Sequence, residues 1–142
     1  MAEPQTLANH ARIDPWYHWV ALPLSAITWI LAIIHVVHHG RPMIWQLIAA
    51  SALLVVMLRV RIYSLRVQDR VIRLEETLRM QALLPTELKA RIGELRPGQF
   101  VALRFASDAE LAERVEEALT QGLAGRAIKE RIKQWRPDTF RV

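Results

Sequence analysis

A chain of 142 residues is long enough for one domain. It contains no cysteine, which excludes disulfides, thiol catalysis and thiolate metal sites. The net charge of +5 is modest and comes without zinc-ligand spacing, a glycine-rich clamp or an aromatic-basic motif, so we expect no nucleic-acid partner. No paired nucleophile and base and no phosphate-binding glycine loop is present, and we expect the protein not to be an enzyme.

The ionisable residues are distributed very unevenly. Between positions 17 and 58 the sole Asp, Glu, Lys or Arg is Arg41, whereas residues 59–142 hold all but two of the 19 Lys+Arg and all but two of the 14 Asp+Glu. A globular domain does not segregate charge in this way, but a membrane part followed by a water-exposed part does. We expect a cytoplasmic or interfacial segment over residues 1–16, a transmembrane part over 17–62 and a cytoplasmic helical region over 63–142.

The first predicted membrane helix covers residues 19–37. Asp14 precedes it as a cap, and Pro15 stands where a missing N–H costs nothing. At about 1.5 Å per residue the helix measures roughly 28 Å, close to the hydrocarbon thickness of a bilayer. Pro23 should kink it or bound a short first segment. Residues 1–3 lack the basic character of a signal peptide, the apolar run starts late and no small-residue cleavage site follows, so we expect a retained span and not a cleaved signal.

Gly40 and Pro42 break the chain and predict a tight turn. A second span is expected over residues 42–58, which is about 25 Å of helix. The small residues at 49–52 favour close packing on the first span or on another protein. The expected membrane part is therefore a two-helix transmembrane hairpin.

The orientation of this hairpin follows from its basic residues. The turn between the spans offers one arginine, whereas five follow the second span. These are Arg59, Arg61, Arg66, Arg70 and Arg73. The positive-inside rule places that segment, and with two spans both termini, in the cytoplasm.

Residues 59–84 contain no Gly or Pro and predict that the second helix continues as a cytoplasmic stalk. Apolar residues repeat there at alternating spacings of three and four, which indicates a coiled-coil seam of about three heptads. They are Val60, Val67, Val71, Leu74 and Leu78, with Ser64 in the one polar place. Glu75 with Arg79, and Asp69 with Arg73, are predicted ion pairs one turn apart.

Several short amphipathic helices are predicted beyond Pro85, over residues 86–95, over 99–106, from Ser107 to near Gly122, and over 126–135. Residues 99–106 could form a strand by residue type, but they have no obvious partner strand. Ser107 and Glu110 form a predicted capping box for the third, and Gly122 and Gly125 should close it. Such short helices are unstable alone, so we expect them to pack on the stalk, on one another or on a partner. The predicted fold class is an all-α membrane protein.

Three stretches of the chain carry a resemblance. They are Gln5, Asn9-His10, Arg12, Asp14-Pro15 and Tyr17-His18; residues 65–76; and residues 102–108 with Glu110-Leu111 and Trp135-Arg136. In these the sequence resembles an uncharacterised family, a domain of unknown function, of short bacterial two-span integral-membrane proteins. The resemblance implies the bacterial inner (cytoplasmic) membrane as the location and implies no activity.

The most chemical-looking feature is His35 and His39, one helical turn apart at the outer rim of the first span, with His38 at the three-residue offset. Imidazoles at this spacing can ligate a tetrapyrrole or metal. No Asp, Glu or Cys lies nearby to complete a ligand set, so the alternative is ordinary rim polarity. We expect no cofactor on balance.

Two further groups are candidate contact sites. Residues at the inner rim are predicted to meet lipid headgroups or a partner, or to clasp the N-terminus to the stalk through an ion pair between Asp14 and an arginine. This group is Arg12, Asp14, Arg59, Arg61 and Arg66. Partner docking is predicted at Arg70, Arg73 and Trp135.

These features together favour a small two-pass inner-membrane accessory or scaffold subunit. Its cytoplasmic helices would dock on a larger membrane complex or self-associate, alongside membrane lipids and with no nucleic acid. The alternative is a membrane protein that binds a cofactor through His35 and His39.

Overall fold

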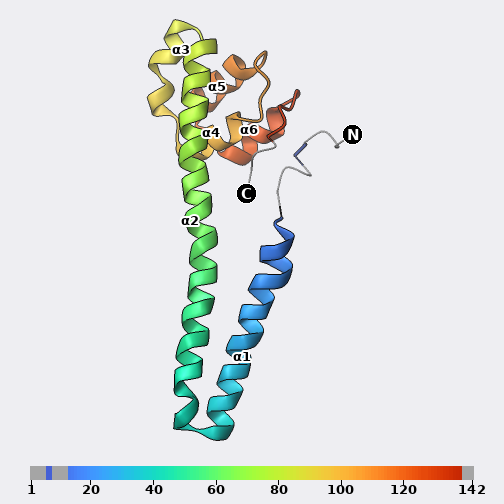
Figure 1. The fold of residues 1–142 in the computed structure, drawn as a ribbon. Coiled ribbons are helices and arrows are strands. Elements are labelled where there is room, and N and C mark those ends of the chain that lie inside the picture. The colour runs from blue at the N-terminus through green and yellow to red at the C-terminus, as the bar shows by residue number, and fades with distance from the viewer. Residues whose placement is uncertain (1–5, 8–12, 139–142) are drawn as a thin grey trace. The chain divides into compact units, whose positions relative to one another are not determined.

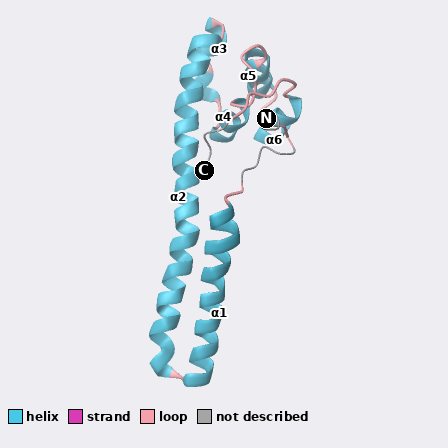
Figure 2. Ribbon diagram, turned by 45° about the vertical axis from the view of Figure 1, so that its right-hand side comes forward, coloured by secondary structure: helices cyan, strands magenta, loops and turns pink. Residues whose placement is uncertain are grey.

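The computed structural model describes residues 6–7 and 13–138 of the chain. Its regular elements in the described part are all helical (Figure 1, Figure 2). In order they are a π-helical turn η1 (Trp16–Ala21), α1 (Leu22–His39), the short η2 (Arg41–Met43), α2 (Ile44–Leu83), α3 (Thr86–Ala90), η3 (Ile92–Glu94), α4 (Pro97–Leu103), α5 (Leu111–Thr120) and α6 (Gly125–Arg131). The chain divides into two compact units, one formed by Ile13–Arg66 and one that contains Val67–Arg141.

The first unit begins at the predicted cap. The amide of Tyr17 donates to the Asp14 carboxylate at 3.1 Å, which supplies an acceptor to the otherwise free first turn. Pro23 lacks an N–H for the carbonyl four residues earlier. The turn ahead of it is π-helical, and the amide of Leu22 donates to the carbonyl of Tyr17, five residues back. The predicted disturbance at Pro23 therefore takes the form of a π-helical turn that leads directly into α1.

Gly40 ends α1 with a φ of 74°, a left-handed conformation that glycine adopts without strain. After the short η2, α2 begins at Ile44. Ala32 of α1 and Ala50 of α2 are both buried, and the indole Nε1 of Trp29 donates to the Ser51 hydroxyl at 2.9 Å. Small residues of α2 thus lie where the two helices meet, because their short side chains allow close approach.

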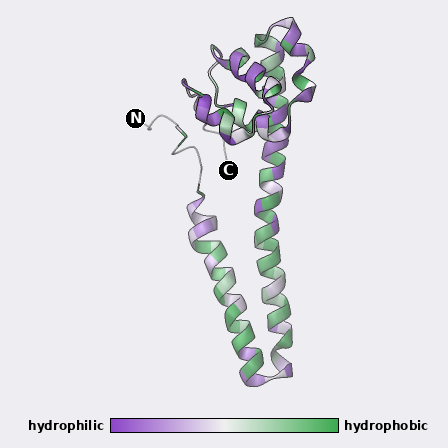
Figure 3. Ribbon diagram, turned by 180° about the vertical axis from the view of Figure 1, so that it is seen from behind, coloured by the Kyte–Doolittle hydropathy of each residue, from purple (hydrophilic) through white to green (hydrophobic). Residues whose placement is uncertain are grey.

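Most of the apolar surface of the first unit faces outward. The helical stretches Trp16–His39 and Arg41–Leu83 are each long and apolar enough to cross a membrane. Just 11% and 6% of their most apolar windows are buried, whereas the core helix of a soluble protein is mostly buried. Figure 3 shows the hydrophobic colour along α1 and the part of α2 that follows the turn.

The second unit has its own hydrophobic core. Its central side chains come from α4, α5, α6 and the loop between α4 and α5. Those that are fully buried include Phe100, Leu103, Phe105, Leu111, Val115 and Ile128. Met80 and Leu84 close the core from the end of α2. The short helices therefore stabilise one another and the last turns of α2, as expected for segments too short to be stable alone.

Three local predictions at the helix ends were wrong. Ser107 and Glu110 do not cap α5; the Glu110 carboxylate instead accepts the amides of Lys133 and Gln134 at 3.2 and 3.0 Å. α4 begins at Pro97, ahead of the predicted start at residue 99, since the missing N–H of proline is tolerated in a first turn. The last helix ends at Arg131, before Trp135, where the chain turns to form a bridge with Ala106.

Gly125 opens α6 and does not close α5, which ends instead near Gly122 with its φ of 60°. A Cβ atom on Gly125 would lie 2.8 Å from the carbonyl oxygen of Gly98, closer than real Cβ atoms approach a backbone atom. Glycine at this position therefore lets α6 pack directly on α4.

Candidate functional site

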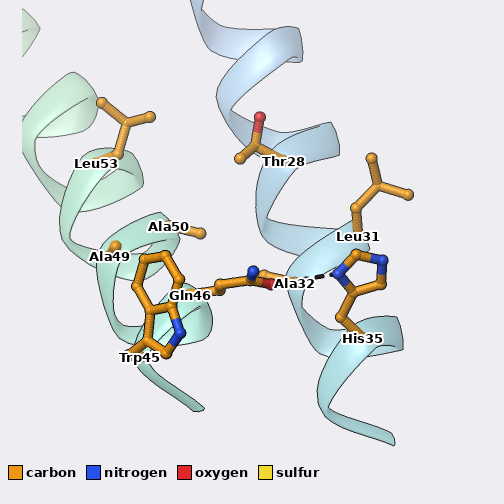
Figure 4. A pocket seen from close by; sticks show the side chains of 9 residues that line it. All are labelled: Thr28, Leu31, Ala32, His35, Trp45, Gln46, Ala49, Ala50 and Leu53. Carbon is orange, nitrogen blue, oxygen red and sulfur yellow. Dashed lines mark hydrogen bonds between the residues drawn. The ribbon is translucent and has the colours of Figure 1, made fainter. Parts of the chain in front are cut away.

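A groove of about 380 Å³ lies between α1 and the start of α2 in the first unit. It is lined by Thr28, Leu31, Ala32, His35, Trp45, Gln46, Ala49, Ala50 and Leu53. Figure 4 shows Gln46 of α2 reaching across the groove to His35 of α1. The lining is apolar apart from these two side chains and Thr28, so any ligand of this groove must be largely apolar.

The contact between His35 and Gln46 fixes one nitrogen of the imidazole. His35 Nδ1 lies 3.2 Å from the Gln46 Oε1. An amide oxygen only accepts, so Nδ1 donates its hydrogen in this pair, and Nε2 is the ring nitrogen that Gln46 does not contact. The His39 ring stands at 83° to the His35 ring with centroids 5.5 Å apart. Sequence reasoning found both histidines but missed Gln46, whose register opposite His35 depends on the turn.

A metal ion bound by these histidines would have few other protein side chains as ligands. Among the residues that the structure describes, no group of three or more His, Cys, Asp or Glu is placed to hold a metal ion. Both His35 and His39 are exposed. This arrangement suits axial ligation through one imidazole nitrogen better than a closed metal site.

The predicted inner-rim site is built around Tyr17 and not around Asp14. The Tyr17 hydroxyl donates to the Met57 carbonyl of α2 at 3.1 Å, and the Arg61 guanidinium lies 5.8 Å from the centre of its ring. Asp14 is occupied with the Tyr17 amide, and within the described residues it forms no ion pair with an arginine of α2. The clasp is therefore a hydrogen bond and a cation–π contact.

The other predicted members of the rim are less engaged. Arg59 and Arg66 are exposed. Arg12 lies outside the described residues. The carbonyl that the Tyr17 hydroxyl contacts belongs to a residue 40 positions away, which local sequence pattern does not reveal.

Of the three residues predicted to dock a partner, two are engaged within the second unit. The Arg73 guanidinium lies 5.7 Å from the centre of the Phe100 ring. Trp135 is half-buried, with its ring 5.1 Å from that of Phe105. Arg70 is exposed on α2 and remains available to a partner.

A charge cluster that the sequence did not predict joins α2 to the segments before α5 and after α6. Arg79 contacts the Glu76 carboxylate at 2.9 Å, the Asp108 carboxylate at 2.6 Å and the Ala106 carbonyl at 2.7 Å. Arg136 contacts the other oxygen of Glu76 at 3.2 Å. The predicted pair between Glu75 and Arg79 was therefore wrong, because Arg79 turns toward the core side of α2.

The predicted seam lies on the opposite side of α2. Val67, Val71, Leu74 and Leu78 are 62%, 48%, 62% and 59% exposed. We call these four residues the apolar stripe. It covers none of the core in the second unit and is the most regular apolar surface there.

Comparison with known protein families gives a match over the whole chain. The matching model is described as a family of unknown function, DUF6526, and covers residues 1–142. No curated protein and no solved structure matches. What the groove, the rim and the apolar stripe do must therefore follow from their own chemistry.

Proposed function

The chain belongs to the DUF6526 family, and from its residues we propose that it is a two-pass accessory or scaffold subunit of the bacterial inner membrane. Residues 17–62 form a transmembrane hairpin, and both termini lie in the cytoplasm. The cytoplasmic helices dock on a larger membrane complex or on further copies of the chain. No reaction is assigned to it.

The outward apolar surface of the first unit is the observation that carries this proposal. Trp16 is 76% and Val37 is 74% exposed, at opposite ends of the first helical stretch. Soluble monomers rarely expose apolar patches larger than a few hundred Å². A bilayer removes the penalty of this surface, and backbone groups within the helices already pair with one another.

The orientation is supported by the distribution of arginines. Arg41 is the sole Asp, Glu, Lys or Arg between positions 17 and 58, whereas Arg59, Arg61 and Arg66 follow closely after the second span. Arginines near the end of a span favour the cytoplasmic side. Each arginine near an anionic leaflet also gains about 1 kcal/mol.

The scaffold role is supported by how the second unit uses its charged groups. Arg79, Glu76 and Arg136 stabilise the unit itself, and their side chains are committed to internal contacts. The apolar stripe stays exposed on the part of α2 in this unit, flanked by charged residues. A surface of this kind favours binding to another helix over catalysis.

Membrane insertion is tested by washing membranes that hold the full chain with alkaline carbonate. The chain should stay in the pellet, as an embedded protein does. Fluorescent protein fused to either terminus should be fluorescent, and alkaline phosphatase fused there should be inactive. Release by carbonate would contradict insertion, and active phosphatase at either end would contradict the orientation.

The scaffold role is tested by purifying the tagged chain from membranes of its host in mild detergent. We expect it to elute with other membrane subunits or as an oligomer, at a size well above that of the single chain in its micelle. A folded monomer that elutes alone would contradict this role.

A second candidate function rests on the contact between His35 and Gln46. Histidines that ligate metals commonly donate their other ring N–H to an oxygen, which is the arrangement seen at His35 Nδ1. A tetrapyrrole held by His35 or His39 should give the native preparation a Soret or chlorophyll band. His35→Ala, or His39→Ala where that residue is the ligand, should remove the band, and His38→Ala should not. A colourless native preparation contradicts this candidate.

A further inference from the structure

The apolar stripe on α2 has heptad spacing. Val67 and Leu74 occupy d positions, and Val71 and Leu78 occupy a positions, so successive members are four, three and four residues apart. A β-branched residue at a with leucine at d favours two-stranded coiled coils, and Val71 followed by Leu74 fits that rule.

The apolar stripe faces away from the core of the second unit. Ile72, Glu76 and Met80 are the buried residues in this part of α2. With about 100° between successive residues, their side lies roughly opposite the stripe. A helix bound along the stripe would therefore leave the core and its charge cluster intact.

The charges beside the stripe complement a parallel copy of the same helix. Arg70 takes a g position and Glu75 takes the e position five residues later. In a parallel two-stranded coiled coil, g of one helix meets e of the following heptad on its partner. Both residues are exposed, and within the described residues neither forms an ion pair.

We propose that the apolar stripe binds a second copy of this chain as a parallel, in-register coiled coil, in which Arg70 of each copy pairs with Glu75 of the other. The proposal deepens the scaffold role proposed above and rests on it, because insertion in one orientation makes the α2 helices of two copies parallel. In an antiparallel pair g meets g and e meets e, so the contact between Arg70 of one copy and Glu75 of the other would be lost.

Two heptads are few for helices that are free in solution. Here the helix already exists in each copy, since α2 is continuous from Ile44 to Leu83. Confinement to one membrane also raises the effective concentration of each copy for the other. Both effects lower the entropic penalty of pairing.

The absence of cysteine allows a direct test by disulfide crosslinking in native membranes. In a parallel in-register pair each a or d residue meets its own copy, within the Cα separation of about 4.4–6.8 Å that a disulfide requires. Val71→Cys and Leu74→Cys should therefore give covalent dimer under mild oxidation. Asp69→Cys is the matched control, an exposed residue at the outer f position.

We expect both stripe variants to yield at least about tenfold more dimer than the Asp69 variant, because the outer positions of a pair lie too far apart to bridge. Equal crosslinking at all three positions would reveal random collision and would overturn the proposal. A folded chain that crosslinks at none of the three positions would also overturn the proposal. A stripe cysteine that crosslinks to a different protein in place of a second copy would overturn it as well.

Charge reversal tests the orientation in the Leu74→Cys background. Arg70→Glu alone and Glu75→Arg alone should each reduce the dimer yield several-fold, because each places like charges together. The double variant should restore the yield, since the pair is then reversed but complete. A double variant as poor as the singles overturns the parallel pairing.

Carbonate washing of the same membranes separates this proposal from the one on which it rests. A chain that stays in the pellet but does not crosslink leaves the membrane role standing and removes the self-association. A chain that is stripped from the membrane removes the membrane role, whatever its crosslinking.

Discussion

Arg136 donates to Glu76 across 60 positions of the sequence, with 3.2 Å between Nη1 and Oε1. The Glu76 side chain is 6% exposed, and its second oxygen accepts from Arg79 at 2.9 Å. One carboxylate of α2 thus binds both an arginine of its own helix and one that follows α6. Glu76 therefore helps to hold the segment that follows α6 against α2.

Replacing Glu76 with alanine should destabilise the second unit. The change leaves Arg79 with fewer partners in a poorly solvated place, and removal of one member of a buried ion pair costs about 3–5 kcal/mol. Because Arg79 keeps Asp108, we expect the lower end of that range. Hydrogen exchange of peptides from residues 86–138 measures the loss.

The matched control for Glu76 is Asp69→Ala on the exposed side of the same helix, where no ion pair is formed in the described structure. Surface changes of this kind alter stability by about 0.5 kcal/mol or less. Equal exchange in the two variants would show that the charge cluster does not stabilise the unit.

Gly125→Ala should loosen the contact between α6 and α4. The added methyl group would lie 2.8 Å from the Gly98 carbonyl oxygen, so one helix must shift. Forcing extra atoms into a packed contact costs about 1–3 kcal/mol. Gly93→Ala is the control, since nothing lies within 4 Å of a Cβ at that position.

Limited proteolysis reads out the two glycine variants. Gly125→Ala should be cleaved faster than the parent chain between residues 120 and 138, and Gly93→Ala should be cleaved at the parent rate there. An unchanged rate for Gly125→Ala would mean that α6 does not rest on α4 as closely as the carbonyl distance requires.

Tyr17→Phe isolates one hydrogen bond in the first unit. The variant removes the hydroxyl that donates to the Met57 carbonyl but keeps an aromatic ring beneath Arg61. Hydrogen bonds between membrane helices contribute about 0.6 kcal/mol on average. We expect a small fall in the thermal unfolding midpoint in detergent, and none for Tyr63→Phe, an exposed tyrosine with no hydrogen bond of its hydroxyl in the described structure. If both variants lowered the thermal unfolding midpoint equally, the loss would not come from the hydrogen bond to Met57.

Much of the helical order follows from local sequence rules. The Asp14 cap, the turn at Gly40 and the unbroken helix after residue 59 each depend on neighbouring residues, and the structure contains all three. The family resemblance was also correct as to an uncharacterised family that covers the chain. Local patterns suffice for such features because the interacting groups are a few residues apart.

Other features depend on contacts that sequence spacing does not encode. Glu110 has the spacing of a capping residue, yet its carboxylate binds amides that are 23 and 24 residues away. Buried Gln99 donates to the carbonyls of Ala118 and Leu123, which are 19 and 24 residues away. In both cases tertiary packing supplies partners that the spacing of capping residues does not predict.

The stability of α5 should depend on pH through Glu113. A hydrogen bond from Arg114, together with its positive charge, lowers the pKa of the Glu113 carboxyl below the ordinary value of 4.5. The folded state therefore binds this proton more weakly than the unfolded state does. Its stabilising contribution is present above the unfolded pKa and is lost as the pH falls through the lower, folded value.

The difference in unfolding midpoint between the parent chain and Glu113→Gln should therefore become smaller as the pH falls. Above the unfolded pKa the parent should have the higher unfolding midpoint, and once the pH has fallen below the lowered, folded pKa the two midpoints should converge, because both side chains are then neutral. Circular dichroism in nonionic detergent measures the midpoints. Glu87→Gln, a change at an exposed residue of α3, should not reproduce this convergence. A constant gap between parent and Glu113→Gln across this range would mean that the contact with Arg114 does not depend on the charge of the carboxylate.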